Sequence, residues 1–83
     1  MITIYSKANC SQCDITVRLA HMRKLHTTVL KLDEDFTLEQ LNALAKFHGA
    51  EEPRSFSVVT ADDGNTYIGG FSEFKDALSR GTL

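Results

Sequence analysis

The only two cysteines of this 83-residue chain, Cys10 and Cys13, have two residues between them. They follow a short apolar run at 2–5, typical of a core strand, and precede a helical pattern from Asp14 to about Lys24. In a strand–loop–helix context, this spacing indicates a dithiol–disulfide redox site. It also brings the two sulfurs close enough to bond when the first cysteine caps the helix. The pair therefore constrains the first part of the fold to a strand, a reactive loop and a helix.

Cys10 is predicted to stand at the start of this helix, beside unpaired backbone N–H groups and the positive end of the helix dipole. A thiolate is stabilised there, and the thiolate is the nucleophile in disulfide exchange. Cys13 falls one turn further along, where it can attack a mixed disulfide formed on Cys10. Two inert, buried cysteines are the plain alternative, but core packing does not explain their place at a helix start.

Zinc is a second alternative for the two cysteines. A zinc site needs four ligands, and only His21, His26 and His48 could add to the pair. The interval from Cys13 to His21 is shorter than the roughly 12 residues of a two-Cys two-His finger, and the chain has no second cysteine pair. The spacing therefore favours redox chemistry over zinc binding.

Length and composition describe one small domain, 1–83, with one modest core. The net charge is −2 without a basic block, which gives little support for nucleic-acid binding. No apolar run approaches the roughly 20 residues of a membrane helix, and Met1 leads directly into a strand pattern instead of a signal peptide. We therefore expect a cytoplasmic monomer without a membrane partner. In that compartment a lone cysteine pair is more often catalytic or metal-binding than structural.

The rest of the chain alternates strand and helix signals. The elements predicted after the first helix are a strand at 27–32, a helix that begins at the capping box of Thr37 and Gln40, a hairpin of strands at 56–60 and 66–68, and a last helix capped by Ser72. The buried face of the first helix is expected to comprise Ile15, Leu19, Ala20 and Met22. The order β-α-β-α-β-β-α makes the first two strands parallel and the last two antiparallel. The sequence therefore predicts an α/β fold with a mixed four-stranded sheet covered by helices.

This order, with the cysteine pair after the first strand, resembles the thioredoxin fold in its minimal glutaredoxin form. The segment 4–13 is similar to the opening of glutaredoxins and, more closely, of NrdH-redoxins. NrdH-redoxins carry Cys-x-Gln-Cys where glutaredoxins usually carry Cys-Pro-Tyr-Cys. The residues at 58–59, the turn at 63–64 and the Gly-Gly-Phe at 69–71 are similar to the glutaredoxin hairpin and the start of its last helix. The resemblance covers essentially the whole chain.

The resemblance implies a small dithiol oxidoreductase that donates electrons to ribonucleotide reductase. Cys10 would attack the substrate disulfide, and Cys13 would resolve the mixed disulfide. Gln12 favours thioredoxin reductase as the reductant. Gly69 and Gly70 favour glutathione, because glutaredoxins, including virally encoded ones, use this segment to bind it, whereas NrdH-redoxins usually have Trp-Ser-Gly-Phe there. The expected redox group is the reversible Cys10–Cys13 disulfide, with no bound cofactor and with glutathione as a co-substrate.

Contacts with substrate or reductant are expected in the cysteine loop and at the neighbouring strand ends. Lys7 is either a solvated charge or a cation that adds positive potential beside the thiolate, and the matching lysine of glutaredoxins contacts glutathione. Gly69 and Gly70 either end a strand with positive φ or allow a ligand to approach the backbone. The expected binding residues are Lys7, Ser11, Gln12, Phe56, Ser57, Gly69, Gly70, Phe71 and Ser72.

Ser57 departs from the pattern of the family. Thioredoxin-fold redoxins have a cis-proline just before the third strand, facing the cysteines, and Pro53 lies too far upstream to fill this position. A cis bond before serine costs about 3–4 kcal/mol over trans, so we expect a trans Phe56–Ser57 bond. The family proline is thought to discourage metal binding at the cysteines. Ser57 therefore leaves an alternative function open, a metal or iron–sulfur module with two thiolates from each of two chains.

Overall fold

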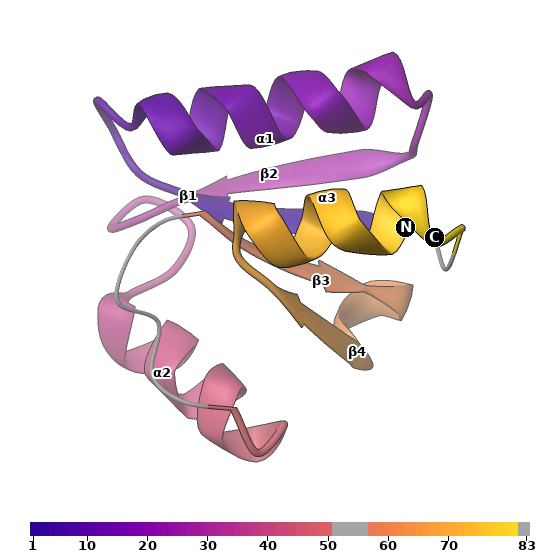
Figure 1. The fold of residues 1–83 in the computed structure, drawn as a ribbon. Coiled ribbons are helices and arrows are strands. Elements are labelled where there is room, and N and C mark those ends of the chain that lie inside the picture. Colours follow the sequence, from indigo (N-terminus) through magenta and orange to yellow (C-terminus); the bar gives the residue numbers. More distant parts are fainter. Residues whose placement is uncertain (51–56, 82–83) are drawn as a thin grey trace.

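The computed structural model describes residues 1–50 and 57–81, which form a four-stranded sheet with helices on its two faces (Figure 1). The elements follow in the order β1 (Ile2–Ser6), α1 (Ser11–Met22), β2 (Thr27–Lys31), α2 (Leu38–Phe47), β3 (Val58–Ala61), the 3₁₀ turn η1 (Asp62–Gly64), β4 (Thr66–Gly69) and α3 (Phe71–Ser79). The predicted order β-α-β-α-β-β-α is confirmed.

The sheet has the strand order β2-β1-β3-β4. β1 pairs in parallel with β2, because α1 returns the chain to the end of the sheet where β1 begins. In this pairing Ile4 lies opposite Val29. β1 pairs antiparallel with β3, where Ile4 lies opposite Val59. β3 and β4 form an antiparallel hairpin closed by η1. The predicted mixed sheet is confirmed, and β2 lies at one of its edges.

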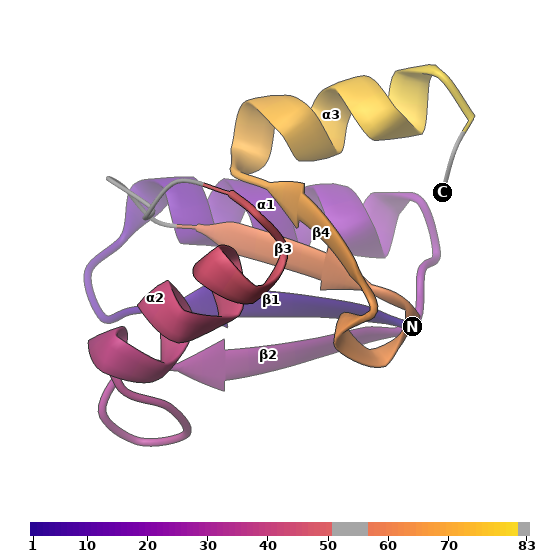
Figure 2. The same cartoon turned by 90° about the horizontal axis from the view of Figure 1, so that it is seen from below.

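The side chains of the strands alternate between two apolar layers, as the two-residue period of a strand requires. The layer under α1 and α3 consists of Ile2, Ile4, Ala20, Val59, Ala61, Phe74 and Leu78. The layer under α2 consists of Phe36, Leu41 and Val58, with Tyr5, Leu30, Leu32, Leu44 and Tyr67 packed against them. Figure 2 shows α2 on the opposite side of the sheet from α1 and α3.

The buried face of α1 differs from the predicted one. Cys13, Thr16 and Ala20 are buried, whereas Ile15 and Met22 are 45% and 73% exposed. The reason is that Cys10 caps the helix and turns Cys13 inward, and the helical period then carries Thr16 and Ala20 to the same face. Thr16 can be buried because its hydroxyl donates to the backbone carbonyl of Gln12. A pattern based on apolar residues alone does not count this threonine.

The start of α3 also differs from the prediction. The N-cap is Gly70, and Ser72 lies exposed in the first turn of the helix. Gly69 has φ of +120°, a conformation that glycine adopts without a steric cost, and it turns the chain into the helix directly after β4. By contrast, the predicted capping box at the start of α2 is confirmed, because Thr37 and Gln40 exchange their hydrogen bonds.

His48 at the end of α2 had no predicted role, but it joins α2 to the hairpin. Its Nε2 lies 2.8 Å from the carbonyl oxygen of Gly64, and its ring lies beside that of Tyr67. Among the described residues, no helix is long and apolar enough to span a membrane.

Candidate active site: the cysteine loop

The cysteine loop leaves the sheet at the end of β1. The hydroxyl of Ser6 donates to the carbonyl oxygen of Leu30 at 2.9 Å, which fixes the end of β1 against β2. Asn9 then has φ of 54°, in the left-handed region that asparagine adopts more readily than most residues. This turn directs the chain into α1, so that the next residue, Cys10, becomes the N-cap of the helix.

Cys10 combines accessibility with the electrostatic environment of a helix start. Its Sγ accepts a hydrogen bond from the backbone N–H of Cys13 at 3.1 Å. Cys10 is half-buried, whereas Cys13 is only 2% exposed. The N–H donor and the helix dipole both favour negative charge on the Cys10 sulfur. The predicted capping role is confirmed, although the helix begins at Ser11 and not at Asp14.

Cys10 and Cys13 are joined by a disulfide bond. Their Cα atoms lie 5.3 Å apart, within the range of about 4.4–6.8 Å that a disulfide can bridge. The loop therefore holds the two sulfurs within reach of each other, as the spacing predicted. This is the arrangement that reversible dithiol–disulfide chemistry requires.

Ser57 lies directly before the start of β3, and it is only 1% exposed. Its Oγ lies 2.6 Å from Oγ1 of Thr16, which in turn donates to the carbonyl oxygen of Gln12 at 2.7 Å. Because the carbonyl can only accept, the hydrogen of Thr16 is used there, and Ser57 must donate to Thr16. Ser57 is thereby linked to the middle of the Cys-Ser-Gln-Cys loop. The sequence did not single out Thr16.

Phe56 and the Phe56–Ser57 bond lie outside the described residues, so the predicted trans bond and the predicted docking at Phe56 stay predictions. Of the remaining expected binding residues, Lys7, Ser11, Gln12 and Ser72 are exposed, and Phe71 is half-buried.

Gly69 and Gly70 approach the site from the start of α3. A Cβ atom on Gly70 would lie 3.5 Å from the backbone oxygen of Ser57, an ordinary contact distance, so the start of α3 lies next to the residue that precedes β3. A Cβ atom on Gly69 would lie 3.1 Å from Glu73, whose side chain covers this turn. Positive φ therefore explains Gly69 on structural grounds, whereas Gly70, with φ of −86°, has a backbone that any residue adopts.

Glu73 is a residue of this region that the sequence analysis missed. Burial raises the pKa of the Tyr67 hydroxyl above its ordinary value of 10.0, and the negative charge of Glu73 adds to this effect. The side chain of Glu73 therefore lies beside Gly69, and its charge acts on Tyr67. A carboxylate in the first turn of a helix is common, so the sequence around Glu73 did not indicate a role for it.

Within residues 1–50 and 57–81, no three His, Cys, Asp or Glu side chains are grouped so that they could hold a metal ion. An iron–sulfur cluster shared by two chains would instead use one cysteine pair from each chain, so it needs no such group within a single chain.

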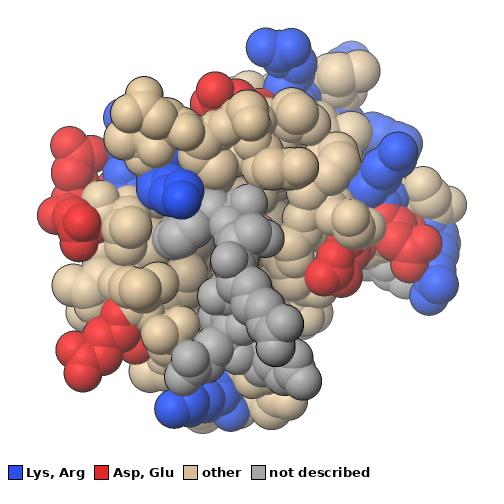
Figure 3. All heavy atoms as spheres, turned by 60° about the vertical axis from the view of Figure 1, so that its left-hand side comes forward, with Lys and Arg blue, Asp and Glu red and all other residues tan. Residues whose placement is uncertain are grey.

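The end of the molecule that carries the cysteine loop has a mixed charge pattern. Figure 3 shows this end with acidic and basic side chains of the described residues scattered across it, so that neither sign dominates.

The architecture was compared with known proteins. The chain matches no protein-family model and no curated protein. Among solved structures, glutaredoxin 1 from Francisella tularensis, complexed with cacodylate, matches with a TM-score of 0.76, covering 98% of this chain and 94% of that chain at 17% sequence identity. The chain has a glutaredoxin-like thioredoxin fold.

Two further structures share this glutaredoxin-like fold. A wheat glutaredoxin matches with a TM-score of 0.75 at 23% identity, covering 99% of this chain and 75% of that chain. The solution structure of a glutaredoxin from Brucella melitensis matches with a TM-score of 0.71 at 17% identity, covering 99% and 82%. At these identities the likeness establishes the fold and not the function.

Proposed function

We propose that this chain is a small dithiol–disulfide oxidoreductase that donates electrons to disulfides of other proteins. The observation that carries the proposal is the position of Cys10. It caps α1, its sulfur accepts the N–H of Cys13, and it is bonded to the buried Cys13. The fold supports the same chemistry, because the solved structures that share it are glutaredoxins.

The reaction begins with both cysteines reduced. The Cys10 thiolate attacks one sulfur of the substrate disulfide, that disulfide breaks, and the departing sulfur takes up a proton as a thiol. The thiol of Cys13 then loses its proton and attacks Cys10 in the mixed disulfide. The Cys10–Cys13 bond forms, and the second substrate sulfur leaves as a thiol. Two electrons and two protons have moved from the chain to the substrate.

The sequence motifs support a proposal for the acceptor and for the reductant. Ribonucleotide reductase is the proposed acceptor, because the Cys-Ser-Gln-Cys loop resembles that of NrdH-redoxins. Gln12 supports thioredoxin reductase as the reductant, and Gly69-Gly70 supports glutathione as a second one, with thioredoxin reductase preferred. The proposed setting is the reducing cytoplasm, where such a reductant restores the dithiol.

Two coupled assays test the reductant and the two cysteine roles together. NADPH oxidation is followed with a model disulfide and either thioredoxin reductase or glutathione with glutathione reductase. The native chain is expected to be reduced in both assays, and faster with thioredoxin reductase. Cys10→Ser should abolish activity in both. Cys13→Ser should accumulate mixed disulfides and retain only monothiol exchange with glutathione. Substantial dithiol activity in Cys10→Ser would contradict the proposal.

An absorbance spectrum of the freshly purified protein distinguishes the metal-binding alternative. A colourless protein that reduces insulin or a model disulfide supports the oxidoreductase. Visible absorption bands that disappear on Cys10→Ser and Cys13→Ser substitution would indicate an iron–sulfur cluster held by the cysteine pair.

A further inference from the structure

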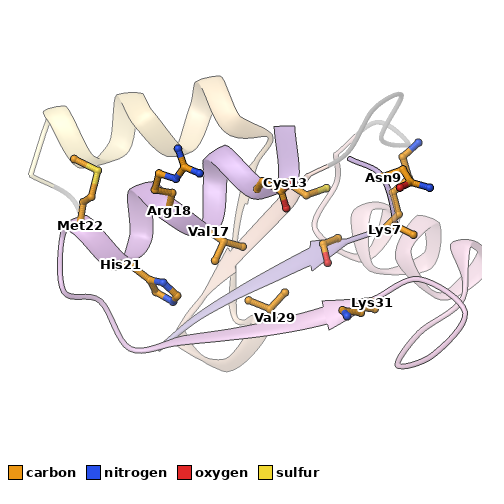
Figure 4. Close-up of a pocket in the computed structure, with 12 residues that line it drawn as sticks. Lys7, Asn9, Cys13, Val17, Arg18, His21, Met22, Val29 and Lys31 are labelled. Atoms are coloured by element: carbon orange, nitrogen blue, oxygen red, sulfur yellow. The ribbon is translucent and has the colours of Figure 1, made fainter. Parts of the chain in front are cut away.

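A groove of about 790 Å³ runs between α1 and the edge strand β2 and ends at the cysteine loop (Figure 4). Val17 and His21 project from α1 toward the sheet, and Val29 projects from β2 toward α1. Cys13 and Asn9 lie at the end of the groove near the loop. The groove therefore connects the outer edge of β2 with Cys13 and with the residues of the loop that precede Cys10.

The free edge of β2 has unpaired backbone groups. The hydrogen bonds from Ile2 N–H to the His26 oxygen and from Leu32 N–H to the Ser6 oxygen show that the even-numbered residues of β2 face β1. In a parallel ladder the residues between them direct their N–H and C=O groups to the other side. Thr27 and Val29 therefore present these groups outward, where no described residue pairs with them. Val29 is 37% exposed.

One end of this edge is closed. The backbone N–H of Lys31 donates to a carboxylate oxygen of Asp35 at 2.9 Å, and the carbonyl of Lys31 accepts from the loop that follows. The open part of the edge is thus the stretch of Thr27 and Val29. An added strand is recognised mainly by such backbone groups, with neighbouring side chains supplying specificity.

The charges that line the groove are unbalanced. Lys7, Arg18 and Lys31 line the groove with basic side chains, and Asp14 is the one acidic side chain among the described residues of its lining. The chain as a whole has a net charge of −2, so this basic lining is a local feature that opposes the overall charge. A segment that carries carboxylates would be complementary to it.

The register places the groove in line with the reaction. Lys31 at the end of β2 lies opposite Ser6, the last residue of β1, and the chain passes from Ser6 through the loop to Cys10. A peptide that lies along β2 in an extended conformation advances about 3.3 Å per residue. A peptide paired at Thr27 and Val29 therefore leaves the edge before Lys31, whose backbone groups are already bonded, and reaches the cysteine loop through the groove within a few residues.

We propose that an extended, acidic segment of an oxidised protein substrate adds to β2 as a further strand, in the groove lined by Arg18 and Lys31, and so presents its disulfide to Cys10. This inference rests on the proposed oxidoreductase function and names its substrate class. Backbone pairing at Thr27 and Val29 provides the alignment, Val17 and Val29 provide an apolar floor, and the basic side chains select the charge.

Amide hydrogen exchange tests the docking without any redox chemistry. The probes are a synthetic peptide of alternating Glu and Val and the same peptide with Lys in place of Glu, both without cysteine. The Glu peptide should slow exchange at the Val29 amide by about tenfold or more when bound. The amides of Thr28 and Leu30 serve as internal controls, because they already face β1. No protection at Val29, or protection by the Lys peptide to the same extent, would overturn the proposal.

Disulfide exchange tests the charge selection. Both peptides, each with one cysteine in a mixed disulfide with a chromogenic thiol, are compared by kcat/KM at low ionic strength. The ratio of acidic to basic peptide should exceed one and should fall by about tenfold in Arg18→Glu/Lys31→Glu. The matched control is Lys75→Glu/Arg80→Glu, which changes the net charge equally at an exposed position of α3 and at its exposed C-cap and should leave the ratio unchanged.

The two measurements separate the two proposals. Reduction of both peptides with a ratio of one would overturn the docking proposal and leave the oxidoreductase function intact. Reduction of neither peptide would contradict the oxidoreductase function, and the docking would then be decided by the exchange at Val29 alone.

Discussion

Ser57 donates its hydroxyl hydrogen to Oγ1 of Thr16 across 2.6 Å, and both side chains are completely or almost completely buried. Because Thr16 donates in turn to the carbonyl oxygen of Gln12, the start of β3 is tied to the middle of the cysteine loop by two consecutive hydrogen bonds. The order of donors makes the two hydroxyls unequal. Among the described residues, the Thr16 hydroxyl has two hydrogen-bond partners and the Ser57 hydroxyl has one.

This inequality predicts the stability of the variants. Thr16→Val removes the acceptor of Ser57 and leaves a buried hydroxyl without a partner, which should lower the free energy of unfolding by about 1–3 kcal/mol. Ser57→Ala should lower it by less, because Thr16 keeps its bond to Gln12. Urea denaturation of the oxidised protein measures both. In the double variant, Ser57→Ala should recover part of the loss caused by Thr16→Val, because it removes the hydroxyl that has lost its acceptor. A larger loss for Ser57→Ala than for Thr16→Val would contradict the donor order.

Thr60 provides a contrasting case in the core. Its side chain is fully buried, and its Oγ1 has no hydrogen-bond partner among the described residues. Thr60→Val keeps the shape and removes the unsatisfied hydroxyl, so the free energy of unfolding should rise by about 1 kcal/mol or more. The same urea titration measures it, and Thr16→Val serves as the matched substitution with the opposite expected sign. A loss of stability in Thr60→Val would show that the hydroxyl is satisfied.

The position of Cys10 predicts which sulfur reacts first. In the reduced protein, iodoacetamide should label Cys10 before Cys13, because Cys10 is the more accessible and has the helix N–H groups at its sulfur. Peptide mapping after a short exposure at neutral pH identifies the labelled residue. In urea both cysteines should react at similar rates, which provides the control. Predominant labelling of Cys13 in the folded protein would reverse the assigned roles.

The environment of Tyr67 predicts a pH effect. Its pKa is raised above 10.0, first by burial and second by Glu73. Glu73→Gln should therefore lower the pKa of Tyr67, though not fully to 10.0, since burial remains. Phenolate absorbance in a Tyr5→Phe background measures it. An unchanged pKa in Glu73→Gln would show that the charge of Glu73 does not reach Tyr67.

The same shift sets the sign of the pH dependence of stability. The folded state favours the neutral tyrosine, so the unfolded chain loses this proton at a lower pH than the folded one. The contribution of Tyr67 is fully present below pH 10.0, the unfolded value, and is lost as the pH rises through the folded pKa. Chemical denaturation on both sides of this value should show the loss in the native chain and a smaller loss in Glu73→Gln.

The sequence predicted those parts of the fold that depend on local patterns. The cysteine spacing, the capping box at Thr37 and the Asp-Gly turn each depend on residues within a few positions of one another, and each is confirmed. The strand pairing followed from the lengths of the connections. These features also predicted the place of the cysteine pair at the start of α1.

The remaining features depend on contacts between distant residues. The buried hydroxyl of Thr16 is paired with that of Ser57, 41 positions away in the sequence. Likewise, the interaction of His48 with the Gly64 carbonyl joins two elements that no short sequence pattern connects. The basic groove is another example, because Arg18 and Lys31 come to line the same groove only after α1 has packed over the sheet.

The hydrogen bond from the Lys31 amide to Asp35 also limits how two copies of this chain can pair through β2. An open sheet edge is a template for aggregation, and proteins protect such edges with short strands and with lysine. Here Asp35 closes one end of β2. Two copies that paired through the remaining edge would also bring two basic grooves together, and their like charges would repel. The edge is therefore long enough to hold one short peptide of the opposite charge and unsuited to building a continuous sheet from identical chains.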